Sequence, residues 1–183
     1  MTNVDTLVTE RLRGERLEEE HRSLMKQMFQ NEQVCATLGG TLSEEMIDRA
    51  MWRNLDHWDR QGFGIWSFFC DETGEFVGRG GLRQVDVDEH VETELAYAVM
   101  PSFWKQGYAT EMSCEILRAG FEDLGLPDVL CFTLTTNQAS QRVMQKLGFT
   151  YERDGLHADL PHVFYRLRRD EWLVNRGSSS SGE

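Results

Sequence analysis

The segment 104–110 is the part of the chain whose residue types and spacing most directly indicate chemistry. It reads Trp-Lys-Gln-Gly-Tyr-Ala-Thr and lies between an expected strand and the longest expected helix. A helix N-terminus presents backbone N–H groups that lack intrahelical partners, and the helix dipole favours negative charge there. Gly107 has no Cβ, so a phosphate can approach the backbone closely. The segment therefore predicts an anion site, although its single glycine does not make it a P-loop.

The stretch 78–81 offers a second candidate phosphate loop. It reads Gly-Arg-Gly-Gly, but it lies inside an expected strand and leads into no helix. Glycine within a strand is typical of a bulge or of close backbone packing. We therefore predict that these glycines serve packing.

Glu94 and Asn137 are two further polar candidates, each on or directly after an expected strand. Glu94 shares a strand face with Ala96 and Ala98, because side chains two residues apart point to the same side. The two alanines are small, which suits close approach of a ligand. Glu94 is either a catalytic group of this site or a surface carboxylate that continues the acidic stretch 86–92. Asn137 follows an expected central strand and is expected to cap the next helix.

Hydrophobic periodicity and turn residues predict the elements that position these groups. Apolar residues from Ala109 to Leu124 follow helical spacing, and Gly125 is expected to end that helix. Ser43 predicts the cap of a helix that ends near Gly62. The other expected elements are helices over 18–30 and 138–146 and strands over 7–12, 65–70, 75–84, 92–100, 128–135, 149–157 and 162–168. They predict one α+β domain over 6–173 with a mixed sheet, followed by a disordered Ser-rich tail over 174–183.

Charge and composition exclude several classes of function. The 183 residues include 31 Asp and Glu against 19 Lys and Arg, a net charge of −12. Nucleic acids and anionic membranes are bound by clustered positive charge, so we expect neither as a partner, whereas a cationic amine is compatible. The four cysteines lack metal-ligand spacing, and we expect Cys70, Cys114 and Cys131 to be buried thiols. The chain opens with no secretory leader, which predicts a cytoplasmic protein.

The order of strand, phosphate-type turn, long helix, strand and Asn-capped short helix resembles the GNAT superfamily of N-acetyltransferases. The resemblance is strongest to the branch that contains the ribosomal-protein N-terminal serine and alanine acetyltransferases. It covers residues 6–173 and rests on Thr-Glu-Arg-Leu at 9–12, Glu-Leu-Ala-Tyr at 94–97, the segment 104–111, Asn-Gln-Ala-Ser at 137–140, Lys-Leu-Gly-Phe at 146–149, Phe-Tyr-Arg-Leu at 164–167 and Glu-Trp at 171–172. It implies a three-layer α/β/α fold with a mixed, mostly antiparallel central sheet flanked by helices.

The resemblance implies a site for acetyl-CoA as the acyl donor, and no metal. The pyrophosphate would lie on the backbone amides of the turn, which is formed by Lys105, Gln106, Gly107, Tyr108, Ala109 and Thr110. Pantetheine would run along Ala98, Val99 and Met100, with Asn137 holding one of its amides. Trp104 stands where most of the family has Gln or Arg, a substitution typical of this branch that leaves the main-chain contacts intact.

The resemblance also assigns catalytic roles. Glu94 is similar to the family's general base, which acts directly or through water. Many relatives have a Tyr seven residues after the Asn as the general acid, but this chain has Met144, which cannot donate a proton. Ser140 is the replacement that the branch suggests as donor to the departing thiolate. The alternative for Ser140 is a local hydrogen bond at the helix start.

These features predict an acetyl-CoA-dependent N-acetyltransferase that moves the acetyl group to a primary amine by direct attack in a ternary complex. The amine would belong to a protein N-terminus or to a small cationic compound. A non-catalytic acyl-CoA-binding module with the same fold is the alternative. The loss of the Tyr acid at Met144 favours the module, whereas Glu94, Asn137 and Ser140 favour the enzyme. The branch also implies a homodimer.

Overall fold

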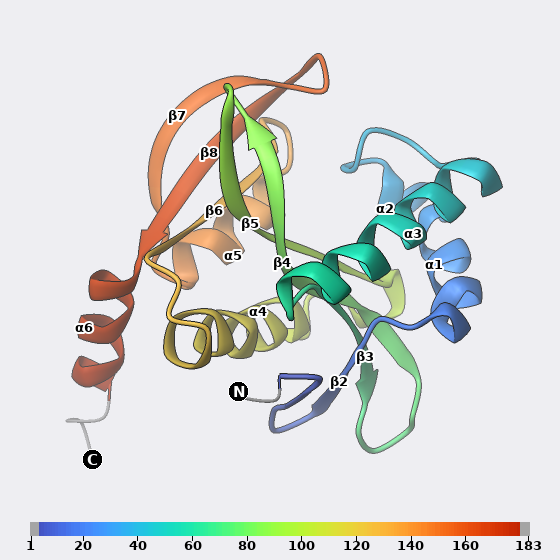
Figure 1. Ribbon diagram of the computed structural model, residues 1–183, viewed down its shortest axis with the longest axis horizontal. Helices are drawn as coiled ribbons and strands as arrows, with labels where there is room; N and C mark the ends of the chain where they lie inside the picture. The colour runs from blue at the N-terminus through green and yellow to red at the C-terminus, as the bar shows by residue number, and fades with distance from the viewer. Residues whose placement is uncertain (1–3, 180–183) are drawn as a thin grey trace.

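In the computed structural model, which describes residues 4–179, the chain forms an eight-stranded sheet with helices on both faces (Figure 1). The strand order is β1-β2-β3-β4-β5-β6-β8-β7, and the parallel pair β5 and β6 stands among antiparallel neighbours. The strands are β1 (Thr6–Val8), β2 (Leu12–Arg16), β3 (Ile65–Cys70), β4 (Phe76–Val87), β5 (His90–Val99), β6 (Asp128–Leu134), β7 (Thr150–His157) and β8 (Leu160–Arg168). The helices are η1 (Glu19–His21), α1 (Arg22–Phe29), α2 (Glu32–Cys35), α3 (Glu44–Gln61), η2 (Pro101–Phe103), α4 (Tyr108–Arg118), η3 (Ala119–Asp123), α5 (Gln138–Lys146) and α6 (Arg169–Ser179). The predicted mixed, mostly antiparallel fold is confirmed.

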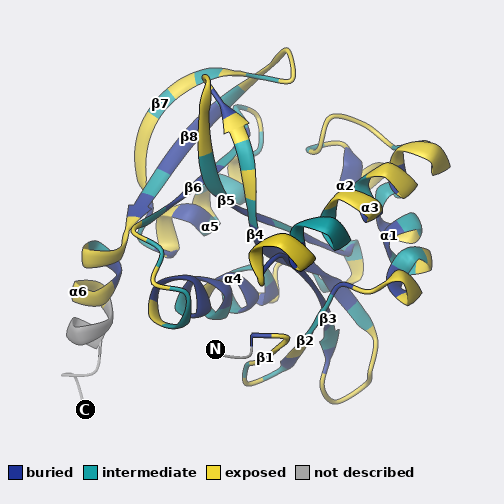
Figure 2. Ribbon diagram, viewed as in Figure 1, coloured by how far each residue is buried: buried dark blue, intermediate teal, exposed yellow. Residues whose placement is uncertain are grey.

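Adjacent residues of β5 send side chains into two separate cores. Leu95 packs in a cluster with Met112 and Ile116 of α4. Ala96, the next residue, packs with Ile47 of α3 and its neighbours. Because successive strand side chains point to opposite faces, α4 and α3 lie on opposite sides of the sheet. Figure 2 shows the buried residues concentrated along the central strands and the sheet side of α4. This is the predicted three-layer arrangement.

Local signals in the sequence are confirmed where the structure tests them. The Ser43 side chain accepts a hydrogen bond from the N–H of Met46, and Gly62 ends α3 with a left-handed φ of 73°. The glycines of β4 serve packing, as predicted. A Cβ on Gly81 would lie 2.1 Å from the carbonyl oxygen of Gly64, and one on Gly78 would lie 2.3 Å from that of Ala98.

Several predicted boundaries are wrong. The single strand expected over 7–12 is two strands, β1 and β2, because the Thr9 hydroxyl accepts from the N–H of Leu12 and closes a turn between them. The helix expected to reach Leu124 leaves α-geometry at Arg118 and continues as the π-helical turn η3. Helix α6 extends into the segment expected as a tail, and residues 180–183 lie outside the described residues. Cys114 is exposed, whereas Cys70 and Cys131 are buried as expected.

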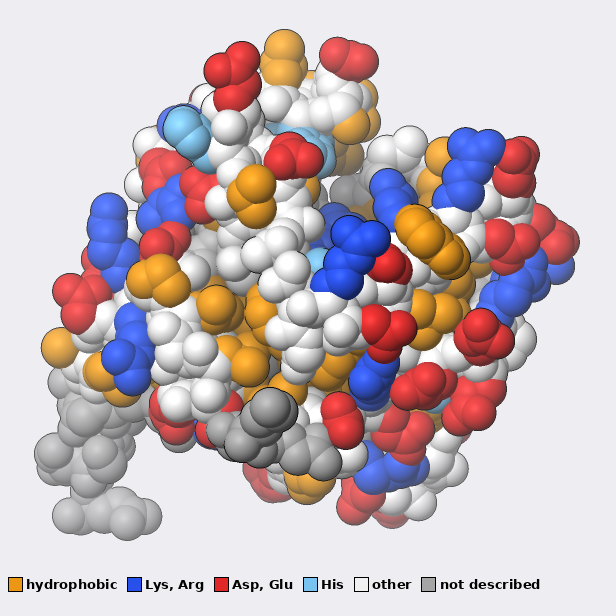
Figure 3. Space-filling view, viewed as in Figure 1, with side chains coloured by type: hydrophobic (Ala, Val, Ile, Leu, Met, Phe, Trp, Pro, Cys, Tyr) orange, Lys and Arg blue, Asp and Glu red, His pale blue; other side chains and the backbone are white. Residues whose placement is uncertain are grey.

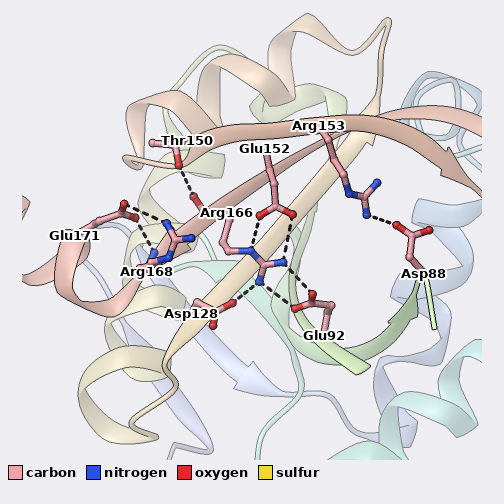
Figure 4. A network of polar contacts seen from close by, with 9 residues as sticks. All are labelled: Asp88, Glu92, Asp128, Thr150, Glu152, Arg153, Arg166, Arg168 and Glu171. Carbon is pink, nitrogen blue, oxygen red and sulfur yellow. Dashed lines mark hydrogen bonds and ion pairs between the residues drawn. The ribbon is translucent and has the colours of Figure 1, made fainter. Parts of the chain in front are cut away.

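Arg166 of β8 ties four strands together where β5 and β6 pair. Its guanidinium donates to Glu92 of β5 at 2.9 and 3.0 Å, to Glu152 of β7 at 2.6 Å and to Asp128 of β6 (Figure 4). The pKa of Arg166 is raised by these carboxylates, so the side chain stays charged. Beyond the parallel pair of Glu94 and Leu130, a cleft opens between the two strands. The Arg166 network therefore holds β5 and β6 together at the end where they pair, and the cleft begins beyond that end.

Candidate functional site

The cleft between β5 and β6 has a volume of about 990 Å³ and continues to the ends of α4 and α5. Its walls include Leu95 to Val99 from β5 and Cys131 to Leu134 from β6. The other end of the cleft is lined by Leu38 and Gly39, which follow α2, and by Leu160 of β8. Figure 3 shows a recess there, between the strand ends and the helices α2 and α3. The cleft is therefore open on both faces of the sheet at the place where two strands separate.

Most of the residues predicted from the sequence lie together in this cleft. Those that line it are Glu94, Ala98, Val99, Lys105, Gly107, Tyr108, Ala109, Thr110, Asn137 and Ser140. Met100 and Gln106 do not line it. Met100 is buried with Met28 and Val34, and its N–H donates to Val77 of β4. The Gln106 carbonyl accepts from Arg11, and its side chain donates to Ser102.

The turn before α4 has a left-handed backbone at two positions. Lys105 and Gly107 have left-handed φ values of 62° and 87°, so the chain folds sharply into the first turn of the helix. The indole of Trp104 donates to the Val99 carbonyl at 2.7 Å, which attaches the turn to the end of β5. The N-terminal amides of α4 and the end of β5 thus form adjoining walls of one site.

A brace from the β1–β2 connection holds this turn. The Glu111 carboxylate accepts from the Thr9 hydroxyl at 2.6 Å and from the backbone N–H and Nε of Arg11 at 2.9 and 2.7 Å. Arg11 also donates to the Gln106 carbonyl and lies 4.2 Å over the Tyr108 ring. Burial would raise the pKa of Glu111, but the hydrogen bonds from Thr9 and Arg11 lower it below its usual value. The segment 9–12, which the sequence singles out without a role, is therefore a positioning element of the turn.

Asn137 caps α5, as predicted. Its side-chain oxygen accepts from the Ser140 N–H at 3.1 Å, and its amide donates to the Thr133 hydroxyl of β6 at 2.9 Å. The amide has a second hydrogen, which is the group that remains for a ligand. Met144, on the same helix, is fully buried in the core and takes no part in the cleft.

Tyr97 is a cleft residue to which sequence reasoning gave no role. Its hydroxyl lies 2.7 Å from the Ser140 hydroxyl and 3.2 Å from the Ser140 carbonyl. Burial raises the pKa of the phenol, so Tyr97 stays protonated at neutral pH. The two hydroxyls form a pair that spans from β5 to α5. The sequence carries one signal for this residue. Tyr97 is a polar aromatic three residues after Glu94 on the same expected strand, so its side chain points to the opposite face of the sheet.

Glu94 is buried and does not belong to the protein surface, which decides against the surface-carboxylate interpretation. Only 5% of the residue is exposed, and its Oε2 accepts from Arg83 Nε at 2.7 Å. Arg83 lies directly across the β4–β5 pair, and the Glu94 carboxylate raises its pKa. One carboxylate oxygen of Glu94 is thus committed to Arg83, and Oε1 remains for a water or an amine.

The charge of the cleft is opposite in sign to that of the chain. Its lining includes one carboxylate, Glu94, and five cations, which are Arg79, Arg83, Lys105, Arg142 and Lys146. The outer face in Figure 3 instead carries many Asp and Glu side chains. A polyanionic ligand would therefore be attracted to this opening in spite of the net charge of −12.

Neither metal ligation nor membrane spanning is indicated by the part of the chain that is described. Within residues 4–179, no group of three or more His, Cys, Asp or Glu side chains could hold a metal ion. No helix in that range is long and apolar enough to cross a bilayer.

Comparisons with known proteins concern the family and the fold. A family model described as an acetyltransferase (GNAT) domain matches residues 11–150. The chain is 35% identical to the FsC-acetyl coenzyme A-N(2)-transacetylase of Aspergillus fumigatus, with 92% of this chain and 78% of that protein covered. An acetyltransferase structure from Agrobacterium tumefaciens superposes with a TM-score of 0.80 at 23% identity, covering 92% of this chain and 96% of that one. A Vibrio cholerae structure assigned as a ribosomal-protein-serine acetyltransferase gives a TM-score of 0.70 at 17% identity over 92% of this chain and 99% of that one, and at such identities the likeness concerns the fold.

Proposed function

The chain belongs to the GNAT acetyltransferase family, and from this premise we propose that it transfers the acetyl group of acetyl-CoA directly to a primary amine bound in the same cleft. The observation that carries the proposal is the arrangement of the cleft. One cavity of about 990 Å³ is lined by the N-terminus of α4, which is suited to phosphate, by the separated strands β5 and β6, and by the buried carboxylate of Glu94. Acetyl transfer is the activity of the family. The primary amine as acceptor and the direct transfer with donor and acceptor bound together are our proposal.

The donor would bind along the cleft with its phosphates at α4. The amides of the turn at 105–110 would receive the pyrophosphate, and Lys105, Arg142 and Lys146 would supply positive charge around it. The pantetheine arm would pass between β5 and β6 toward Glu94. Acetyl-CoA supplies the activated acyl group, and the groups of this chain bind and orient it.

The backbone of β5 offers a donor for the oxygen that becomes negative during transfer. The N–H of Met100 donates to Val77 on β4, and backbone N–H groups alternate in direction along a strand. The N–H of Val99 therefore points away from β4 and toward the gap beside β6. A donor fixed by the sheet at that place would stabilise an oxyanion without reorganising during the reaction.

Proton transfers would be carried by Glu94 and by the Tyr97–Ser140 pair. Glu94 Oε1 would accept a proton from the ammonium form of the acceptor, through a water molecule. The neutral amine nitrogen would then form the new C–N bond and give up its second proton to water as the C–S bond breaks. The hydroxyl of Ser140 would donate a hydrogen bond to the departing thiolate, which takes a proton from water and leaves as the CoA thiol. Tyr97 positions that hydroxyl at 2.7 Å. The contribution of the donor is small because a thiol of pKa about 8.5 is a good leaving group.

The compartment and the assembly stay predictions. Cys35, Cys70 and Cys131 are buried thiols, as expected for a protein of the reducing cytoplasm. The homodimer implied by the ribosomal-protein acetyltransferase branch, and the exclusion of nucleic acid and membrane partners by net charge, also remain as proposals.

Thiol release from acetyl-CoA in the presence of a panel of primary amines tests the proposal. We expect release with at least one amine, and a fall of about 10²–10⁴-fold in turnover for Glu94→Gln at unchanged CoA affinity. Asp86→Asn is the matched control, because Asp86 lies on β4 near the same hairpin but is exposed and outside the cleft. Full activity of Glu94→Gln would remove Glu94 from the mechanism, and no release with any amine would refute acetyl transfer to amines.

A further inference from the structure

Arg79 of β4 is a buried cation whose guanidinium makes no hydrogen bond or ion pair with the described residues. Only 8% of the residue is exposed, and its Nε makes no hydrogen bond. Within residues 4–175, whose side chains are described, no hydrogen bond or ion pair involves its guanidinium. Its one specific contact is the Phe29 ring, whose centroid lies 5.0 Å from the guanidinium carbon. A guanidinium has five N–H donors, so this burial leaves a large hydrogen-bonding capacity unused.

Arg79 keeps its charge in this position. Burial, together with the neighbouring Arg83, lowers its pKa to about 10, which is still well above neutral pH. Burying an unpaired charge is costly, and proteins normally pair such a group. The guanidinium lines the cleft, so the missing partner can arrive from solution.

Among the described residues, Glu94 is the carboxylate that attracts Arg79 electrostatically, but it is shared with a second guanidinium. Glu94 already accepts from Arg83 at 2.7 Å. Cys35, whose sulfur interacts electrostatically with Arg79, stays a neutral thiol because burial raises its pKa. Two guanidiniums and one carboxylate therefore share this region, which leaves one positive charge uncompensated.

The position of Arg79 assigns it to the acceptor side of the cleft. It lies directly opposite Ala98 in the β4–β5 register, and cross-strand partners project from the same face. That face is the one of Glu94 and Ala96, which packs against α3, and it is opposite to the face covered by α4. Helix α4 and the Arg79 side chain therefore lie on opposite faces of the sheet. An anion on Arg79 would lie beside the strand end where the thioester is expected.

On the basis of the proposed function, we propose that Arg79 binds a carboxylate of the acceptor, and that the acceptor is a small amine that also carries a carboxylate, as an amino acid does. The planar fork of the guanidinium matches a carboxylate with two parallel hydrogen bonds. Ala98, opposite it, leaves room for the ligand. An acceptor with both an amine and a carboxylate narrows the predicted set of a protein N-terminus or a small cationic amine, because the acceptor meets the charge of the cleft and not that of the whole surface.

The test compares acceptors that differ in the carboxylate alone. L-amino acids and their amides are offered as matched pairs, and thiol release from acetyl-CoA gives kcat/KM for each. The variants are Arg79→Met, Arg79→Lys and, as the matched control, Arg142→Met from the α5 wall of the same cleft. CoA affinity is measured by calorimetry, and the melting temperature is recorded with and without each acid in the presence of CoA.

We expect wild type to prefer at least one acid over its amide, and Arg79→Met to lower kcat/KM for that acid by about 30-fold or more while the amide is used as before. CoA affinity should not change in Arg79→Met. Arg142→Met should weaken CoA binding and keep the preference for the acid. Arg79→Met should also melt at a higher temperature than wild type, because it removes an unpaired buried charge. Arg79→Lys keeps the charge but loses the fork, so its preference should be intermediate.

Two results would overturn the assignment while leaving acetyl transfer intact: equal use of acids and amides by wild type, or weaker CoA binding in Arg79→Met. If no amine is acetylated, the proposed function fails and the melting temperatures decide the question for Arg79. Stabilisation of wild type by an acid and not by its amide, lost in Arg79→Met, would support the carboxylate site. No stabilisation by any acid would refute it.

Discussion

Replacing Glu111 by Gln tests whether the brace from the β1–β2 connection holds the turn at 105–110. The two contacts of Oε1, with Thr9 and the Arg11 N–H, can survive in the variant. The two contacts of Oε2, at 2.7 and 2.5 Å to the Arg11 side chain, cannot, because an amide N–H₂ would face the guanidinium. Each charge-assisted hydrogen bond contributes about 1.5–3 kcal/mol when shielded. The Arg11 side chain is 41% exposed, so we expect screening to reduce the total loss to about 2 kcal/mol.

The same substitution should weaken CoA binding about tenfold, since a turn that is no longer pre-organised must be ordered by the ligand. Urea unfolding measures the stability change and calorimetry measures the affinity. Glu115→Gln is the control. Glu115 pairs with Arg118 on the same helix at 2.7 Å but does not contact the turn, so it should cost at most about 1 kcal/mol and leave CoA affinity unchanged. Equal effects of the two variants, or unchanged CoA affinity in Glu111→Gln, would refute the positioning role.

The pH dependence of this variant has a definite sign. The pKa of Glu111 is lower in the folded protein than in the unfolded chain, so its contribution to stability is complete above the unfolded value of about 4.3. It is lost as the pH falls through the lower folded pKa. The stability difference between wild type and Glu111→Gln should therefore be largest near neutral pH and shrink in acid. A difference that is constant from pH 7 to pH 3 would show that the carboxylate charge is not involved.

Three further substitutions probe other parts of the site and fold. Gly107→Val places a β-branched residue at a φ of 87°, which costs about 1–2 kcal/mol, and blocks approach to the turn, so calorimetry should find CoA binding abolished in a folded protein. Ser140→Ala should lower the single-turnover rate of acetyl transfer at least about tenfold, and Tyr97→Phe should lower it less, because Tyr97 acts through Ser140. Equal rates with a reduced melting temperature in Ser140→Ala would assign that hydroxyl to structure alone. Arg166→Met leaves three carboxylates without their cation and should lower the free energy of unfolding by about 2–4 kcal/mol in urea titrations, and a loss below 1 kcal/mol would refute the network's stabilising role.

Local signals made much of this fold predictable. Ser43, Gly62 and Asn137 act within one or two turns of their own position, so their caps follow from residue type and spacing. Helical periodicity also indicates which side chains of α4 are buried, and the prediction that Cys114 is buried did not take it into account. Cys114 falls outside the apolar stripe of α4, while Ser113 falls on it, and the structure accordingly exposes the first and buries the second.

Boundaries that depend on contacts distant in sequence were not predictable in this way. The break between β1 and β2 comes from the Thr9 hydroxyl, which bonds Leu12 and also Glu111, a residue 102 positions further on. The alternation of apolar residues over 7–12 gives no sign of that partner. The strand register that places Arg83 opposite Glu94 is likewise fixed by the whole hairpin. The sequence identified Glu94 as a candidate site residue, but it could not say what holds the carboxylate.

The burial of Arg79 was likewise not predictable from the sequence, and it bears on which acceptor the cleft would bind. In the sequence it is one arginine among three glycines, and the net charge of −12 suggests a cationic acceptor. Net charge averages over the entire surface, where most Asp and Glu side chains lie, whereas a substrate is selected by the few groups that line its cavity. The charged side chains of this cleft are mostly cationic, and the guanidinium of Arg79, a buried residue, makes no hydrogen bond or ion pair with the described residues. Its guanidinium lies against the Phe29 ring of α1, a contact that no pattern along β4 encodes. The carboxylate that we propose for the acceptor is therefore inferred from the three-dimensional arrangement, and composition alone does not indicate it.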